Sequence, residues 1–359
     1  MNGSSEETGA RRQAPARPRP ALRRVRSTVA RVAKTWMLRG GVMGALRTVR
    51  PSRKLGVLRY HAICGPEGFG YADPSICISA EAFERHVQYL VGHYRVLDLP
   101  AAVSVLRRGG TLPANAVAIT FDDGYADNLH ASRVLHRHGV NGTFYITSGC
   151  LAGGEPFWPS EIRSLVAAIP GRRFTLTAAG ERLELSHDTP AERQAALRQL
   201  ARLFKSHPIA IREDLREQLR RLARHAAYVS PMLTWDQLAE MHGLGMTIGA
   251  HTVTHPNLPS AGLEDAEREI AGSKAQLERA LGVPITMFSY PNGGAERYFT
   301  PDVQRLVRTA GFEASVTSRN GFAGAHSDLY ALERVQVAER LEDLVFALEV
   351  ERFAFAPTS

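Results

Sequence analysis

The sequence predicts an α/β protein whose parallel sheet can close into a TIM-like barrel. Two observations support this fold class. Apolar, β-branched segments alternate with helical patterns from residue 54 onward, which is the order of a parallel sheet, and seven or eight such units suffice to close a barrel. The composition, 44% hydrophobic and 22% charged over 359 residues, is typical of a globular protein with a substantial core.

Eight short segments are predicted as strands because they are rich in apolar and β-branched residues and are bounded by turn residues. Helical periodicity separates several of them, most clearly over residues 264–281, where Ala266, Ile270 and Leu277 share one face and Gly282 supplies the stop. Further helices are expected over residues 80–92 and 126–138. The expected strands cover residues 54–61, 94–99, 116–122, 142–147, 246–251, 285–290, 312–317 and 332–337.

One region interrupts this alternation. Residues 155–233 contain charged, helix-forming stretches such as 191–204 and 213–225, and no convincing strand of the barrel type. We predict a helical insertion between two strands. It either caps the functional site and shapes substrate choice, or it packs as an appendage far from the chemistry.

Residues 1–53 form a basic arm ahead of the main domain, which we place at residues 54–350. Residues 1–54 contain 14 Lys and Arg against two Glu, and 30 basic against 34 acidic residues remain for the rest of the chain. We expect disorder through about Leu22. Residues 25–49 mix apolar and basic side chains, which fits either a helix on an anionic membrane surface or a helix docked on the domain. No nucleic-acid-binding motif accompanies the arm, and we expect no nucleic-acid partner.

Location and redox state follow from what the sequence lacks. No apolar run reaches the ~18 residues of a spanning helix, and the N-terminus does not have the order of a secretory signal peptide. We expect a cytoplasmic protein, with peripheral membrane contact through the arm left open. Cys64, Cys77 and Cys150 are odd in number and lack metal-type spacing, so neither a disulfide framework nor a cysteine zinc site is expected.

Two adjacent carboxylates end the third predicted strand. Asp122 and Asp123 precede Gly124, which permits a sharp turn. Neighbouring side chains leave the backbone in different directions, so one carboxylate can bind a cation while the other remains free for a proton. Alone, an Asp-Asp-Gly triplet is weak evidence, because Asp and Gly are ordinary turn residues.

A histidine pair supplies the supporting evidence. His251 ends another predicted strand, and His255 follows four residues later in a turn that contains Pro256. Imidazole nitrogens at this spacing can converge on one metal. One carboxylate and two histidines leave positions open for water and substrate, which is typical of a catalytic rather than a structural metal site.

These two motifs resemble those of the polysaccharide deacetylases, carbohydrate esterase family 4 with its NodB-homology domain, and the order of motifs covers residues 58–337. The resemblance implies a distorted (β/α)7 barrel. It also implies that Asp123, His251 and His255 bind a divalent metal, usually zinc. Asp122 would then be the general base for the attacking water.

The segment 288–293 departs from the common family pattern. Ser289 stands where many members have an arginine that pairs with the base, and Asn292 stands where they have an aromatic residue. The resemblance implies that the backbone N–H of Asn292 is the oxyanion donor. We expect Tyr290, Asn292 and Tyr125 to contact the substrate.

The proton donor also differs from the common pattern. The segment 332–337 has no histidine where the family usually supplies one, whereas the first strand ends in His61, as in a branch with a first-strand Tyr-His motif. The resemblance implies that His61 protonates the leaving amine, and a buried structural histidine is the competing interpretation. Arg334 either contacts a carboxylate in the pocket or only closes the barrel.

The function that these residues favour is removal of N-acetyl groups from an amino-sugar polysaccharide or oligosaccharide, with release of acetate, in exopolysaccharide biosynthesis. The partner would be an acetylated glycan. An O-acetyl esterase or another amide hydrolase fits the same barrel, because only the leaving group differs. A catalytically silent glycan-binding barrel is the third interpretation. The sequence leaves the sugar, its linkage and the oligomeric state open.

Overall fold

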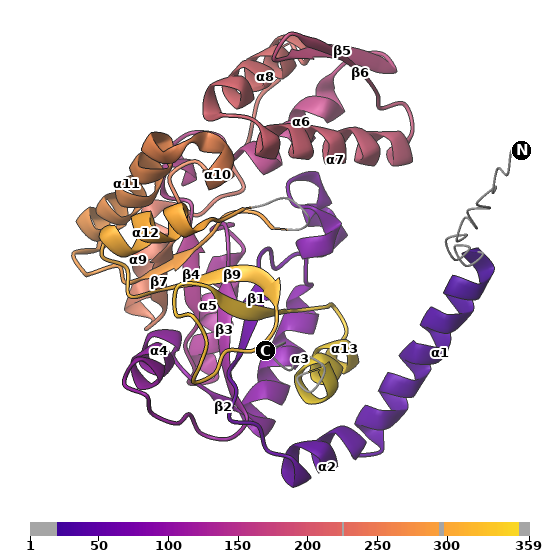
Figure 1. Cartoon of the computed structure of the whole chain (residues 1–359). Coiled ribbons are helices and arrows are strands. Elements are labelled where there is room, and N and C mark those ends of the chain that lie inside the picture. Colours follow the sequence, from indigo (N-terminus) through magenta and orange to yellow (C-terminus); the bar gives the residue numbers. More distant parts are fainter. Residues whose placement is uncertain (1–19, 225, 294–297, 352–359) are drawn as a thin grey trace, which may run out of the picture.

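Seven parallel strands form a closed barrel in the computed structural model, which describes residues 20–224, 226–293 and 298–351 (Figure 1). The order around the barrel is β1-β10-β9-β8-β7-β4-β3, and β3 pairs back onto β1. The predicted distorted (β/α)7 barrel is therefore confirmed. One further short strand, β2, pairs with the start of β3.

The strands lie inside or close to the predicted segments. The largest difference is at residues 94–99, where the strand is only two residues long because Asp98 caps the next helix by accepting a hydrogen bond from the Ala101 N–H. The strands are β1 (Gly56–Tyr60), β2 (Arg95–Val96), β3 (Ala116–Phe121), β4 (Thr143–Ile146), β7 (Thr247–Ala250), β8 (Met287–Ser289), β9 (Ala314–Asn320) and β10 (Leu332–Gln336).

Helices on the outside of the barrel connect most of the strands, and their ends follow local sequence signals. The side chain of Ser79 caps the first turn of α3, and Gly282 adopts a left-handed conformation with φ 69° where α11 ends. These helices are α3 (Ala80–His93), α4 (Leu99–Arg107), α5 (Asn128–Arg137), α9 (Trp235–Gly243), α10 (Leu258–Ala261), α11 (Leu263–Leu281), α12 (Pro301–Thr309) and α13 (Leu341–Phe346).

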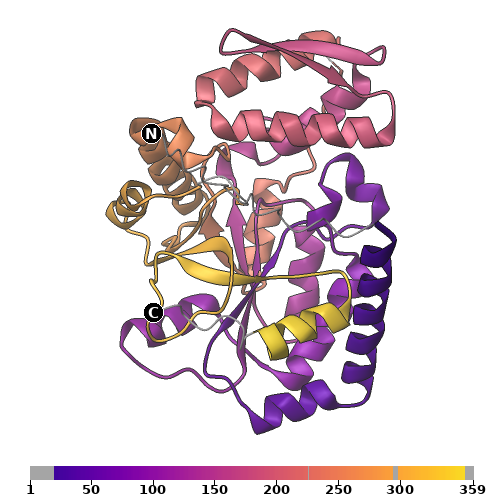
Figure 2. The same cartoon turned by 45° about the vertical axis from the view of Figure 1, so that its right-hand side comes forward.

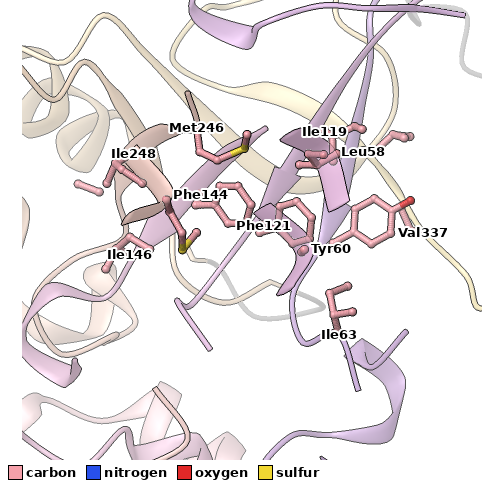
Figure 3. Packing of buried hydrophobic residues seen from close by; sticks show 14 of the residues in the cluster. Leu58, Tyr60, Ile63, Ile119, Phe121, Phe144, Ile146, Met246, Ile248 and Val337 are labelled. Carbon is pink, nitrogen blue, oxygen red and sulfur yellow. The ribbon is translucent and has the colours of Figure 1, made fainter. Parts of the chain in front are cut away.

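Aromatic and branched aliphatic side chains of the strands pack against the surrounding helices and form the main hydrophobic core (Figure 3). Phe121 stacks on Phe144 with ring centroids 4.4 Å apart and on Tyr60 at 5.3 Å. Full burial of one such side chain contributes about 1.5–3 kcal/mol. This packing between strands and helices fixes the strand ends, and the residues that follow those ends have a rigid support.

Residues 158–222, between β4 and β7, form a separate lobe above one end of the barrel in both views (Figures 1 and 2). It has its own hydrophobic core, which includes Leu165, Phe174, Leu200 and Leu215. It contains α6 (Trp158–Ala168), β5 (Arg173–Ala178), β6 (Glu181–Ser186), α7 (Pro190–Ser206) and α8 (Ile209–Leu222). We call this lobe the insertion.

The insertion contains three helices, and it also contains an antiparallel hairpin of β5 and β6 that the prediction did not include. Its two-residue loop, Ala179 and Gly180, has φ of 50° and 88°, as a primed hairpin turn requires. Phe174, Leu176 and Ala178 alternate with exposed or half-buried threonines. That period-two pattern was present in the sequence and is the signal that the prediction missed.

The N-terminal arm contains two helices, α1 (Pro20–Arg39) and α2 (Val42–Val49). The disorder expected through about Leu22 concerns mostly residues 1–19, which lie outside the described residues. α1 docks on α13, where Lys34 Nζ lies 2.9 Å from Asp343 Oδ1 and Thr35 donates to Glu342 over 3.2 Å. Within the described ranges, no helix combines the length and the apolar character needed to cross a membrane.

Candidate active site

Asp123, His251 and His255 converge at the carboxyl ends of β3 and β7, the end of a parallel barrel where functional residues gather. The Nε2 atom of His251 lies 3.4 Å from Asp123 Oδ1, and that of His255 lies 3.3 Å from the same oxygen. All three side chains are buried, and one ligand atom from each lies within 4.8 Å of the others. The three residues predicted as metal ligands are thus brought together.

The donor set fits a divalent metal. His251 Nδ1 lies 2.7 Å from the Ser289 carbonyl oxygen, and a carbonyl can only accept, so Nδ1 carries a hydrogen and Nε2 is the nitrogen that faces Asp123. Burial raises the pKa of Asp123, but the two histidines outweigh it and hold that pKa well below its usual value. One carboxylate and two imidazoles suit zinc or a similar cation.

Backbone strain is concentrated at this site. Among the described residues, seven that are not glycine have positive φ, and four of these seven line or adjoin the Asp-His-His group. They are Asp123 at 78°, Thr252 at 67°, His255 at 58° and Asn292 at 73°. Left-handed conformations cost a non-glycine residue of order 1–3 kcal/mol and persist where the surroundings enforce them. These surroundings therefore hold the turn of residues 252–255 in place.

Asp122 lies beside this group and forms a bidentate ion pair with Arg334. Arg334 Nη1 lies 2.8 Å from Asp122 Oδ1, and Nη2 lies 2.6 Å from Oδ2. Burial raises the pKa of Asp122, but the Arg334 charge and hydrogen bonds outweigh it and hold the pKa well below its ordinary range. Arg334 therefore contacts a pocket carboxylate and does more than close the barrel.

Arg334 also lies beside Ser289, the position at which this sequence lacks the arginine of the common family pattern. Arg334 extends from β10 and its Nη2 lies 3.3 Å from the Ser289 hydroxyl. A guanidinium from β10 thus occupies the neighbourhood where the common family pattern places one from β8. It places a fixed positive charge beside Asp122.

His61 follows β1 and faces Asp122 across the site. Its Nε2 lies 3.8 Å from Asp122 Oδ2, and its side chain is 20% exposed, so it is not enclosed in the apolar core. Burial lowers the pKa of His61 to about 4, against the opposing effect of the two aspartates. The imidazole is therefore neutral at pH 7 before substrate binds.

A cavity of about 550 Å³ opens above these residues, a volume that suits a small-molecule or sugar ligand. Tyr125 and Asn292 line it, as predicted from the sequence, together with His61 and the Asp-His-His group. A larger cavity of about 1350 Å³ lies elsewhere along β9 and β10 and has none of these residues in its lining. We place the site by its chemistry and not by cavity size.

Tyr290 does not lie where a substrate contact requires it. Its side chain is buried in the barrel wall, stacked on Phe299 with centroids 4.9 Å apart. Its hydroxyl donates to the Tyr330 carbonyl over 3.0 Å. Successive side chains at the end of β8 point to opposite faces of the sheet, and that of Tyr290 points away from the pocket. Tyr290 is therefore not among the described residues that line the cavity.

The insertion forms one side of the cavity, which the sequence could not decide. Trp158, Ile162 and Arg163 reach it from α6, and Leu197, Arg198, Ala201 and Lys205 reach it from α7. Arg163 Nη2 lies 2.5 Å from Asp73 Oδ2, which joins the insertion to the loop after β1. The insertion is therefore a cap on the site and not a remote appendage. Its amphipathic helices gave no sequence signal for this placement.

The fold and the site define a class: a parallel α/β barrel that carries a buried Asp-His-His group with a second carboxylate at the carboxyl ends of its strands. Residues 204–315 match the model of the polysaccharide deacetylase family, and this range contains both histidines. YxkH of Bacillus subtilis (strain 168), named as a candidate polysaccharide deacetylase, is 23% identical over 85% of this chain and 79% of its own length.

Solved structures show the same fold. The Streptococcus pyogenes deacetylase PplD in complex with acetate superposes with a TM-score of 0.55 and 20% identity, over 83% of this chain and 99% of its own. IcaB from Ammonifex degensii gives a TM-score of 0.52 and 20% identity, over 83% and 97%. The resemblance predicted from the sequence is confirmed: residues 204–315 match the polysaccharide deacetylase family model, and the relative YxkH and the fold neighbour PplD both carry deacetylase names, which supports a deacetylase-type hydrolase.

Proposed function

We propose that this protein removes N-acetyl groups from an amino-sugar polysaccharide or oligosaccharide in a metal-dependent reaction, with Asp122 as the general base. The observation that carries the proposal is the juxtaposition of two aspartates with different partners. Asp123 faces two imidazoles at 3.3 and 3.4 Å, whereas Asp122 is paired with Arg334 at 2.6 Å. One carboxylate is thus arranged to bind a cation, and its neighbour is kept ionised to accept a proton.

The proposed roles follow from these positions. Asp123, His251 and His255 would hold a divalent cation such as zinc, which lowers the pKa of water and polarises an acetyl carbonyl. Asp122 accepts the proton of the attacking water, and Arg334 keeps it ionised and oriented. Asn292 lines the cavity and has a positive φ. Its backbone N–H is the proposed donor to the developing oxyanion.

His61 is proposed to protonate the leaving amine. It is neutral at rest, so it must acquire a proton during turnover before it can protonate the amine. The Asp122 carboxylate lies 3.8 Å away, receives the proton of the attacking water and can pass it to His61. An amine leaves poorly without a proton, whereas an alkoxide needs it less. The placement of His61 in the cavity therefore favours an amide over an ester substrate, and supports assignment to the branch with a first-strand Tyr-His motif.

Acetate release tests this proposal. Metal-loaded protein incubated with N-acetylated glucosamine oligosaccharides should release acetate and expose free amines, and removal of the metal by a chelator should stop the reaction until zinc is restored. Asp122→Asn should bind metal but release no acetate. Bound metal with no turnover on any acetylated glycan, unchanged by Asp122→Asn, would support a silent glycan-binding barrel instead.

We further propose that the reaction belongs to exopolysaccharide biosynthesis and that the arm contacts the cytoplasmic face of a membrane. On α1, Val29, Val32 and Trp36 lie three and four residues apart on one face and are exposed, Trp36 at 73%. The arm is also strongly basic. Full-length protein should sediment with vesicles containing anionic lipid, and Trp36→Ser should reduce this. Equal sedimentation with vesicles of neutral lipid would contradict a contribution of the basic side chains to membrane binding.

A further inference from the structure

We propose that the insertion is part of the metal site, with Trp158 and Arg212 acting as positioning residues for His255. This inference rests on the proposed metal ligands and goes beyond them. It predicts that metal affinity depends on residues of a lobe that supplies no ligand.

The two histidines are supported in different ways. The His251 ring is oriented by its own hydrogen bond to the Ser289 carbonyl at 2.7 Å, a barrel contact. For His255, Nδ1 is buried and has no hydrogen-bond partner among the described residues. Its ring is instead packed against Phe157 and Trp158, with centroids 5.3 and 6.0 Å away. Metal-binding histidines usually have a polar partner at the second nitrogen, so His255 needs another source of orientation.

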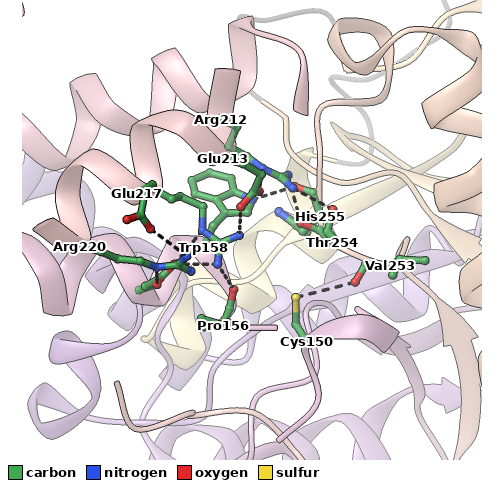
Figure 4. A network of polar contacts seen from close by, with 12 residues as sticks. Cys150, Pro156, Trp158, Arg212, Glu213, Glu217, Arg220, Val253, Thr254 and His255 are labelled. Atoms are coloured by element: carbon green, nitrogen blue, oxygen red, sulfur yellow. Dashed lines mark hydrogen bonds and ion pairs between the residues drawn. The ribbon is translucent and has the colours of Figure 1, made fainter. Parts of the chain in front are cut away.

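Hydrogen bonds from the insertion to the backbone supply that orientation (Figure 4). Trp158 Nε1 donates to the His255 carbonyl over 2.9 Å. Arg212 donates from Nη1 to the Thr254 carbonyl over 3.2 Å and from Nη2 to the Thr254 hydroxyl over 2.9 Å. Three donors from α6 and α8 therefore fix two consecutive residues of the ligand turn.

The barrel holds the other side of the same turn. The Glu269 carboxylate of α11 accepts the backbone N–H groups of Val253 and Thr254 over 2.7 and 2.8 Å, and the Thr254 hydroxyl over 2.5 Å. The Thr254 hydroxyl thus accepts from Arg212 and donates to Glu269. The turn lies between an arginine of the insertion and a carboxylate of the barrel, which explains how the left-handed Thr252 and His255 are maintained.

Arg212 is itself held rigidly. Its side chain is 2% exposed and pairs with Glu213 at 3.0 Å. Glu213 in turn pairs with Arg216 at 2.7 Å, and Arg216 pairs with Glu161 at 2.7 Å and donates to the Pro156 carbonyl over 2.8 Å. Arg212, Arg216 and Glu161 are buried and resist rearrangement, because an unpaired buried charge is costly, whereas Glu213, which bridges the two arginines, is partly exposed. The network transmits the position of α6 and α8 to the His255 turn.

Metal affinity of the full-length protein tests the inference. After chelator treatment, Co²⁺ and Zn²⁺ dissociation constants are measured by competition with a chromophoric chelator, and the Co²⁺ absorption spectrum reports coordination. Arg212→Met removes the contacts to Thr254, and Trp158→Phe removes one hydrogen bond and retains an aromatic ring. We expect about 10- to 100-fold weaker binding for Arg212→Met and a smaller loss for Trp158→Phe.

The matched control is Arg220→Met. Arg220 pairs with Glu161 over 2.8 Å in the same network but makes no contact with the ligand turn among the described residues. Arg220→Met should lower the thermal midpoint and leave the metal dissociation constant within twofold of wild type. Should Arg212→Met fail to fold by circular dichroism, Trp158→Phe decides the outcome together with Thr254→Val, which removes the hydrogen bonds of the Thr254 hydroxyl to both Arg212 and Glu269.

Dissociation constants within twofold of wild type for the folded Arg212→Met, Trp158→Phe and Thr254→Val variants would overturn the inference. The proposed function fails in a different way: wild type that binds metal tightly and weakens on Arg212→Met, yet releases no acetate, refutes the reaction and leaves the positioning role intact.

Discussion

The two histidines of the site are held by different parts of the molecule. His251 extends from a barrel strand and is oriented by the carbonyl of the neighbouring strand, whereas His255 lies in a strained turn that the insertion and α11 hold from opposite sides. The barrel therefore provides a rigid half of the site, and the insertion completes the other half. The lobe that covers the cavity is therefore also the lobe that holds a proposed metal ligand.

The largest effect on the reaction rate is expected from a substitution in the barrel half of the site. Asp122→Asn removes the proton acceptor, and loss of a general base typically costs about 10²–10⁴-fold in rate. Because Asp122 is not among the proposed ligands, metal affinity should stay within a few fold of wild type. Steady-state acetate release and metal titration on the same preparation measure both quantities. A variant that loses metal and activity together would mean that the two aspartates do not have separate roles.

The next effect concerns the proton donor on β1. His61→Gln should lower kcat on an N-acetylated oligosaccharide by about 10²-fold. With an O-acetylated or aryl acetate substrate, kcat should fall much less, since the leaving group needs less protonation. Equal losses on amide and ester would indicate that His61 only shapes the cavity.

Arg334→Met should shift the pH profile. The folded-state pKa of Asp122 is depressed, so the base is ionised at and above neutral pH and loses activity only when pH falls through that low value. Without the guanidinium, burial alone raises the pKa, and the acidic limb of kcat/KM should move to higher pH. The unpaired buried charge should also cost about 3–5 kcal/mol of stability.

A swap variant sharpens this prediction. Ser289→Arg combined with Arg334→Ser restores a guanidinium from β8, and the acidic limb should move back toward that of wild type. If the limb stays at its wild-type position in Arg334→Met alone, Arg334 does not set the pKa of the base.

The smallest effect on the site is expected from substitutions in the hydrophobic cores of the insertion and of the barrel domain. Leu200 in the insertion and Leu90 in the barrel are both fully buried, and Leu→Ala at such sites costs about 2–5 kcal/mol. Both variants should lose stability in thermal denaturation. Only Leu200→Ala should also weaken metal binding, by a few fold, because it loosens the lobe that holds His255. Equal affinities in both variants would remove the distinction between the two halves.

The sequence was sufficient for the barrel and for the residues that converge in it. Strand positions followed from apolar segments with turn boundaries, and Asp122, Asp123, His251 and His255 stood out because polar groups directly after buried strands meet at one edge. Tyr290 was misplaced because a side chain one residue away on a strand end points to the opposite face. Its aromatic character gave no indication of which face that was.

The contributions of Arg334, Trp158 and Arg212 could not be predicted in the same way. Arg334 follows Glu333 in a buried strand, and the sequence suggested a pocket carboxylate as one possible partner without indicating which one. Trp158 and Arg212 act across 97 and 42 residues of chain, and contacts at such separations depend on how the insertion docks. Helical periodicity identifies the buried face of a helix but not the element that it contacts.

The most direct test of the account is a crystal structure of the zinc-loaded protein with anomalous data collected on both sides of the zinc edge. The account predicts an anomalous peak about 2.0–2.2 Å from Asp123, His251 Nε2 and His255 Nε2, with Asp122 still paired to Arg334 and outside the coordination sphere. A peak at another group of residues, none at this site, or Asp122 as a ligand in place of Asp123, would contradict it.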